Sequence, residues 1–320
     1  MNYQDKHRLA LINPYQSVVK VFDCKEGDIL TGIKNSSAIP NALMHRLEKT
    51  GFALHTIDKK SQLAGRAVDT QLINPISGRL MSGSSSGTAI NVFAGINDLG
   101  IGNDGGGSVL APAISLNIIG FISRLIEIDR IQNEKENTDG MLAGNSLGFM
   151  TRDRGILLKA IKDSVDVEAA DDYGIIFSDK EYDNINSKII ELKDCMLPRQ
   201  ELTEYLESVL SECDVLVIQE GPIDLEGFGD SLFGHFDERT KAIQNASGKG
   251  YVRVCNTAKA TALALPGKQF GCATLLICQS NKDKLAKLLK AAEYIEDYHD
   301  PLIERYFLDI NSYIDEGYQV

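Results

Sequence analysis

The sequence predicts an α/β protein, in which strands and helices alternate along the chain and pack as layers. Short apolar runs typical of buried strands occur at residues 52–56, 215–219 and 273–278. Helical periodicity accompanies them, because apolar residues fall on one face of residues 201–212 and 282–298. The chain has 320 residues and is 43% hydrophobic, which is enough for a sizeable buried core.

The first half of the chain alternates helices and strands in order. Residues 41–50 predict a helix with its leucines and methionine on one face, and Gly51 follows where a left-handed cap is common. A strand is expected next, at 52–56. Small and apolar residues at 88–94 indicate a short helix, and a brief strand follows at 99–101. The glycine-rich loop NDGGGS comes directly after this strand.

The second half continues the same alternation. Thr151 is expected to cap a helix, because apolar residues recur at helical spacing after it. The helix at 201–212 leads into the buried strand VLVIQ at 215–219, and ATLLIC at 273–278 predicts a late strand. The most polar stretch, residues 131–140, is interpreted as an exposed loop rather than a domain linker.

The charge balance argues against some classes of partner. With 33 Lys and Arg against 45 Asp and Glu, the formal net charge is −12, which repels phosphate backbones and anionic membrane surfaces. No basic run offsets this charge. We therefore expect neither nucleic acid nor a membrane as a partner.

The six cysteines show no CxxC pair and no spacing with histidine that suggests a metal site, so they are interpreted as buried thiols. The N-terminus has too short an apolar stretch for a signal peptide, and no run approaches the roughly 18 apolar residues that span a bilayer. A cytoplasmic protein without metal or cofactor is expected.

Two short motifs offer competing hypotheses within one stretch. Gly100–Gly105 satisfies GxGxxG, which in a dinucleotide site opens a helix, but Pro112 and the residues around it do not predict a helix. This motif is interpreted as a glycine turn. Gly83–Gly87 satisfies GxSxG, which would make Ser85 the nucleophile of a serine esterase or hydrolase.

The GxSxG hypothesis needs a strand before the serine and a histidine beside it. The preceding residues NPISGRLMS are rich in Pro, Gly and Ser instead, and His235 and His299 are merely available partners. The hypothesis therefore remains a second alternative.

The whole stretch Asn74–Phe121 resembles the amidase-signature family. That family's pattern is NP, a short spacer, GGSSGGS, a helix of small residues, a TDxGGS loop and then IRxPA. Ser84 falls on the first serine of the pair and Ser108 on the serine of GGS, 24 residues apart as in the pattern. A looser similarity extends over about residues 18–297, so the resemblance implies one shortened domain over residues 1–320.

The resemblance implies a mixed β-sheet sandwiched between α-helices, and a Ser–Ser–Lys relay that cleaves amides through an acyl-enzyme. Ser108 would be the nucleophile and Ser84 the bridging serine, preceded by a cis peptide bond after Gly83. The base would be a lysine, whose proton must be lost near neutrality, at a cost of roughly 4 to 5 kcal/mol unless burial lowers its pKa.

The same resemblance assigns roles to the glycine loop. The amides of Gly105, Gly106 and Gly107 match the positions that would bind the oxyanion, and glycines let a substrate approach them closely. Asp104 matches a loop aspartate that would stabilise this loop.

The lysine is assigned from a pattern with a gap. The family's VKDxFD resembles the sequence VKVFD at 19–23 with one residue deleted, which makes Lys20 the base. Alignment without a gap places Phe22 on the lysine position instead. Ser82 and Ser86 replace family glycines, and Leu110 replaces the arginine after the nucleophile.

These features together predict an amide-bond hydrolase or acyl-transfer enzyme acting on a small-molecule or peptide amide. The departures from the pattern also allow an alternative, a catalytically silent protein that uses the same fold to bind a ligand or a protein partner. The sequence specifies neither the substrate nor the oligomeric state.

Overall fold

A computed structural model describes the chain except for residues 62–66, 128–134, 137–141, 231 and 315–320. The loop expected at 131–140 therefore lies largely outside the described residues. Of this loop, the backbone of β6 (Lys135–Glu136) is described, and it pairs with that of β7 (Leu142–Ala143), just beyond the loop, as a separate two-stranded ribbon.

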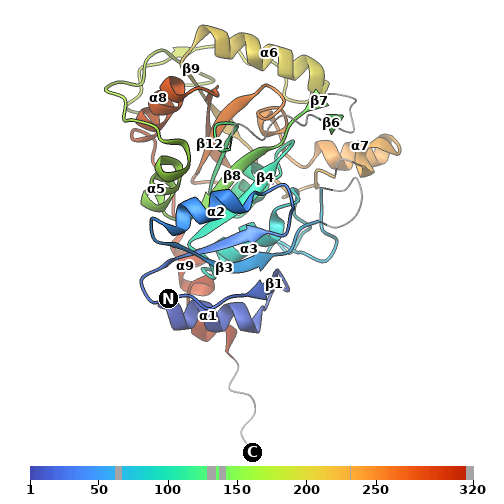
Figure 1. Ribbon diagram of the computed structural model, residues 1–320. Coiled ribbons are helices and arrows are strands. Elements are labelled where there is room, and N and C mark those ends of the chain that lie inside the picture. Colours follow the sequence, from blue (N-terminus) through green and yellow to red (C-terminus); the bar gives the residue numbers. More distant parts are fainter. Residues whose placement is uncertain (62–66, 128–134, 137–141, 231, 315–320) are drawn as a thin grey trace, which may run out of the picture.

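The centre of the fold is an eleven-stranded sheet with the order β1-β3-β2-β4-β8-β5-β12-β13-β11-β9-β10 (Figure 1). It is a mixed sheet, because β2 is parallel to β3 and β4 whereas β8 is antiparallel to β4 and β5. The strands are β1 (Val18–Val21), β2 (Ile29–Lys34), β3 (Phe52–Asp58), β4 (Leu99–Asp104), β5 (Ile119–Ser123), β8 (Ser146–Thr151), β9 (Ile176–Ser178), β10 (Lys188–Ile189), β11 (Val215–Glu220), β12 (Ala260–Pro266) and β13 (Ala273–Gln279).

Helices cover both faces of this sheet. Alternate residues of the central strands enter different cores, as Leu216 and Ile218 of β11 pack with one cluster and Val215 and Val217 with the other. The first cluster also holds α3, α4 and α6, and the second holds α2, α5 and α8. The helices are α1 (Tyr3–Ile12), α2 (Asn41–Glu48), α3 (Ser86–Phe93), α4 (Leu110–Ser115), α5 (Arg154–Val165), α6 (Arg199–Glu212), α7 (Glu238–Asn245), α8 (Lys282–Ala292) and α9 (Pro301–Phe307). The predicted α/β sandwich is confirmed.

Two local expectations are corrected. Thr151 does not cap a helix but ends β8, and Asp153 caps α5 by accepting a hydrogen bond from the amide of Ile156. The residues after the glycine loop do form a short helix, α4, despite Pro112. Proline is tolerated there because it lies in the first turn, where its missing amide would have no partner within the helix.

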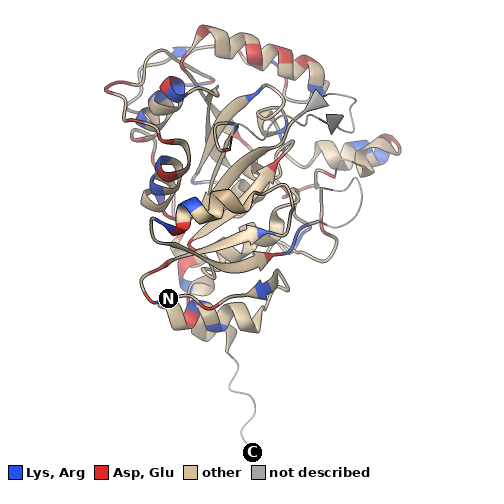
Figure 2. Ribbon diagram, viewed as in Figure 1, with Lys and Arg blue, Asp and Glu red and all other residues tan. Residues whose placement is uncertain are grey.

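Charged residues of both signs are interspersed along the helices, although α6 carries mainly acidic residues (Figure 2). In the part of the chain that the structure describes, every helix is too short or too polar to cross a membrane.

Candidate active site

Three segments with polar side chains meet at the carboxyl ends of two neighbouring strands. Lys34 is the last residue of β2, Ser84 lies just before α3, and Ser108 lies just before α4. β2 and β4 are parallel neighbours, so their carboxyl ends lie side by side. The carboxyl ends of parallel strands commonly form ligand sites. The order of the sheet thus brings together residues that are far apart in the sequence.

The two serines that the sequence singled out are in contact. The hydroxyl of Ser84 lies 3.1 Å from that of Ser108, and the Ser84 amide lies 3.4 Å from the same Ser108 oxygen. A second bond joins the segments, because the amide of Ser85 donates to the carbonyl of Ser108 at 3.3 Å. Both serine side chains belong to half-buried residues, so the pair lies at an accessible surface.

Lys34 completes a continuous line of polar atoms. Its Nζ lies 2.7 Å from the Ser84 hydroxyl and 3.4 Å from the carbonyl oxygen of Asn103, and the residue is only 3% exposed. Burial lowers the pKa of Lys34 to about 7, although the carboxylate of Asp104 opposes this shift. A lysine with this pKa is about half neutral at pH 7, and the neutral amine can accept a proton.

The expected lysine, Lys20, is not the one that contacts the serines. β1 is the edge strand of the sheet, so Lys20 is exposed, with its Nζ over the ring of Phe22 at 4.7 Å from the ring centre. The backbone of Phe22 is bound to the neighbouring chain segment, since its amide donates to the carbonyl of His55. Lys34 likewise ends a short, largely apolar run, ILTGIK, but the interior position of its strand follows only from the order of the sheet.

The glycine loop is shaped by Asp104. Its carboxylate accepts hydrogen bonds from the amides of Gly107 at 2.7 Å, Val109 at 2.6 Å and Leu110 at 3.4 Å. Gly107 has a φ of 96°, a conformation that favours glycine. The Gly107 amide, which the resemblance assigned to an oxyanion site, is therefore already bonded to a carboxylate.

The remaining amides of this loop are differently placed. Within the described residues, no hydrogen bond engages the amides of Gly105, Gly106 and Ser108. These three residues are half-buried, unlike Gly107. Asn256, which sequence reasoning missed, also binds the loop, because its side-chain amide donates to the carbonyl of Gly105 at 3.4 Å.

The turn before Ser84 differs from the expectation of a cis bond. Among the described residues the cis peptide bond is Gly221–Pro222, and the bond between Gly83 and Ser84 is trans. Gly83 supplies the turn through a φ of 107°, and a Cβ on it would lie 2.6 Å from the ring of Pro112.

The serines that replace family glycines hold this turn. The amide and the hydroxyl of Ser82 both donate to the carboxylate of Asp224, and the Ser86 hydroxyl donates to the carbonyl of Gly83 at 2.5 Å. Asp224 is fully buried, and burial raises its pKa to about 6, against the opposing effects of Lys249 and the Ser82 hydrogen bonds.

The two competing motifs lack the context that they require. Ser85 is fully buried, and its hydroxyl lies 2.8 Å from where a Cβ on Gly102 would be, so it is not presented like the nucleophile of an elbow. His299 lies 3.7 Å from Asp297, and His235 lies in a separate 3₁₀ turn. The GxGxxG motif does not open a helix either, because Gly100 to Asp104 lie within β4 and the next helix, α4, begins only at Leu110.

No set of three or more His, Cys, Asp or Glu side chains that could hold a metal occurs among the described residues. All six cysteines are free thiols, four of them buried and two half-buried.

Solved structures share this architecture. A crystal structure of an amidase superposes with a TM-score of 0.62 at 13% identity, covering 91% of this chain and 94% of that one. One subunit of the glutamyl-tRNA(Gln) amidotransferase of Thermotoga maritima gives a TM-score of 0.60 at 15% identity, covering 90% of each chain. A 6-aminohexanoate cyclic dimer hydrolase gives 0.63 at 11% identity over 96% and 93%. The chain thus has the fold of the amidase-signature enzymes.

Sequence comparison gives a shorter match. The corresponding subunit of the glutamyl-tRNA(Gln) amidotransferase of Methanothermobacter thermautotrophicus is 34% identical over 79 residues, which cover 23% of this chain and 17% of that relative. No protein-family model matches the chain. The predicted resemblance to amidase-signature enzymes is confirmed for the fold.

Proposed function

We propose that this protein cleaves amide bonds through an acyl-enzyme on Ser108, with Ser84 and Lys34 as the proton relay. The observation that carries the proposal is the continuous line from Lys34 Nζ to Ser84 Oγ at 2.7 Å and on to Ser108 Oγ at 3.1 Å. Both separations are within the range over which a proton passes directly between heavy atoms.

The reaction follows from these contacts. Neutral Lys34 accepts the proton of Ser84 as Ser84 accepts that of Ser108, and the Ser108 oxygen attacks the amide carbon. The amides of Gly105, Gly106 and Ser108 lie next to the position where the oxyanion forms. The proton returns along the relay to the departing nitrogen. Water then hydrolyses the acyl-enzyme, or another amine accepts the acyl group in a transfer reaction.

The names of the structural relatives support an amide as substrate. They include an amidase, one component of an amidotransferase, and an allophanate hydrolase from Kluyveromyces lactis, which has a TM-score of 0.60 at 12% identity. The substrate would be a small-molecule or peptide amide. The neutral form that burial favours at Lys34 is the form that a general base needs.

Reaction with a fluorophosphonate probe, mapped by peptide mass spectrometry, tests the nucleophile. We expect labelling at Ser108 in the wild type, its loss in Ser108→Ala, and its persistence in Ser85→Ala, a matched change of a neighbouring serine. Labelling at Ser85 would favour the elbow mechanism instead. A folded protein that takes no label at any serine would support the silent, ligand-binding alternative.

A further inference from the structure

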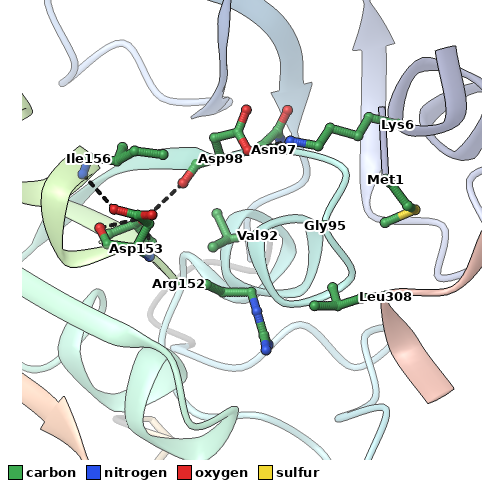
Figure 3. Close-up of a pocket in the computed structure, with 11 residues that line it drawn as sticks. Met1, Lys6, Val92, Gly95, Asn97, Asp98, Arg152, Asp153, Ile156 and Leu308 are labelled. Atoms are coloured by element: carbon green, nitrogen blue, oxygen red, sulfur yellow. Dashed lines mark hydrogen bonds and ion pairs between the residues drawn. The ribbon is translucent and has the colours of Figure 1, made fainter. Parts of the chain in front are cut away.

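A cavity of about 210 Å³ lies near the start of β4, whereas the two serines lie near the end of that strand. Figure 3 shows the side chains that line it, which come from α1, α3, the start of α5 and the residue after α9. Val92, Ile156 and Leu308 contribute apolar side chains. Arg152, between β8 and α5, lines the cavity as well. The cavity therefore combines an apolar wall with an arginine side chain.

The guanidinium of Arg152 has few partners for a group that is largely buried. The side chain is 17% exposed, and its Nη2 atom lies 3.8 Å from a carboxylate oxygen of Glu304, which is beyond hydrogen-bond distance. It makes no hydrogen bond with any of the described residues. A guanidinium carries five N–H donors, and buried donors are nearly always satisfied. Arg152 therefore has donors to offer to an acceptor that enters the cavity.

The positive charge of Arg152 is only partly compensated within the protein. Burial lowers the pKa of Arg152, and the carboxylate of Glu304 opposes this shift without cancelling it. The side chain of Glu304 is 50% exposed, so water screens the attraction between the two groups. A buried cation is unfavourable unless it is paired, so a second anion beside Arg152 would be stabilised.

The other charged groups on the wall of the cavity are bound to groups of the protein. Lys6 forms an ion pair with Asp98, whose second oxygen accepts the amide of Leu30 at 3.0 Å. Asp153 accepts the amide of Ile156 at 2.9 Å, and it is exposed, so solvent screens its charge. Arg152 is thus the charged group of this wall whose donors are not used.

The backbone on both sides of Arg152 is fixed. Thr151 ends β8, and its hydroxyl donates to the carbonyl of Asp98 at 2.7 Å. The amide of Asp153 donates to the same hydroxyl at 3.1 Å. Because these bonds lie within the protein, a ligand that binds Arg152 would not have to order this segment.

We propose that this cavity binds a short aliphatic carboxylate, with its acid group on Arg152 and its alkyl chain against Val92, Ile156 and Leu308. A guanidinium binds a carboxylate through two parallel hydrogen bonds, and burial of the alkyl chain adds affinity. A water molecule takes up about 30 Å³ in the liquid, so a cavity of about 210 Å³ has room for an acid of about four to six carbons. The inference does not depend on the proposed function, because the cavity and the serines lie near opposite ends of β4.

Calorimetric titration of the full chain with three matched compounds tests the ligand class. They are 4-methylpentanoate, the neutral 4-methylpentan-1-ol, and acetate, which has the acid group without the alkyl chain. We expect 4-methylpentanoate to bind at one site, and each of the other two to bind at least about tenfold more weakly. Equal affinity for the acid and the alcohol would overturn the inference.

Variants of the two charged residues locate the binding site. Arg152→Gln should weaken binding of 4-methylpentanoate by about tenfold to hundredfold and leave binding of the alcohol unchanged. Glu304→Gln removes a carboxylate that competes for the arginine, so it should tighten binding by up to about fivefold. Equal affinity of the wild type and Arg152→Gln for the acid, or weaker binding in Glu304→Gln, would contradict the assigned site.

Three further variants act as controls. Arg152→Lys keeps the charge without the planar fork and should retain part of the affinity, which also covers a loss of folding in Arg152→Gln. Arg239→Gln removes an exposed arginine from α7 and should change nothing. Ser108→Ala should bind the acid as the wild type does. Loss of binding in Ser108→Ala would place the acid at the serines instead and would overturn the inference.

Discussion

Two lysines lie near opposite ends of α3 and β4, and their environments differ. At one end, Lys34 is 3% exposed and contacts the neutral hydroxyl of Ser84. At the other end, Lys6 forms an ion pair with Asp98 at the rim of a cavity of about 210 Å³. Figure 3 shows this cavity, with Val92 of α3 and Gly95, which follows the helix, on its wall.

The difference between the two lysines lies in their partners. The side chains of Lys6 and Asp98 are 18% and 22% exposed, so each charge is both paired and partly solvated. Lys34 has a serine instead of a carboxylate as its direct partner, and burial lowers its pKa to about 7. A carboxylate partner favours the ammonium form, whereas a hydroxyl partner in a buried site permits the neutral amine.

Removing each lysine in turn gives the largest expected contrast. Lys34→Met should slow labelling of Ser108 by about 10² to 10⁴-fold, because it removes the proposed general base. Lys6→Met and Lys20→Met should leave the labelling rate within about twofold of wild type, since neither lysine contacts the serines. Similar rates for Lys34→Met and Lys20→Met would remove Lys34 from the mechanism.

The pH dependence of labelling sharpens the same contrast. The pKa of Lys34 is lowered to about 7, so the base is protonated below that pH and neutral above it. The labelling rate should fall by about tenfold for each pH unit below 7 and reach a plateau above about pH 8. In Lys34→Met the rate should be low and independent of pH over this range. A wild-type profile that is flat from pH 5 to 8 would contradict the relay.

A smaller effect is expected from the group that holds the serine turn. Asp224→Asn offers one acceptor oxygen to two Ser82 donors, so one donor loses its partner and the free energy of unfolding should fall by about 1–3 kcal/mol. The labelling rate should fall as well, since Ser84 is two residues from Ser82. Glu226→Gln, an exposed change in the same loop, is the matched control. Equal denaturation midpoints for the two variants would contradict this role of Asp224.

Local motifs predicted the parts of the site that lie close together in sequence. The serine turn and the glycine loop belong to one segment of the chain, and 24 residues separate Ser84 from Ser108. Their contact follows because both segments immediately precede helices that pack in the same core. The alternation of strands and helices could also be predicted from local sequence, since each element carries its own periodicity.

Residues from distant strands were missed, because sheet order decides where they lie. Lys20 and Lys34 both occur in short apolar runs, but β1 is an edge strand and β2 is an interior strand beside β4. Asn256 binds the glycine loop and Asp224 binds the serine turn, and both residues lie in the last third of the chain. A pattern in sequence holds no information on such long-range neighbours without the strand order.

The bonds of Asp104 have a consequence for the entropy of binding. A flexible loop loses conformational freedom when it closes on a ligand, at roughly 1–2 kcal/mol for each residue that becomes ordered. Here a carboxylate within the protein already binds the loop, through the amides of Gly107, Val109 and Leu110. The amides of Gly105, Gly106 and Ser108 belong to half-buried residues and have no hydrogen-bond partner among the described residues. An anion forming beside Ser108 would meet a receptor that is rigid beforehand, so its stabilisation is not offset by a cost of ordering the loop.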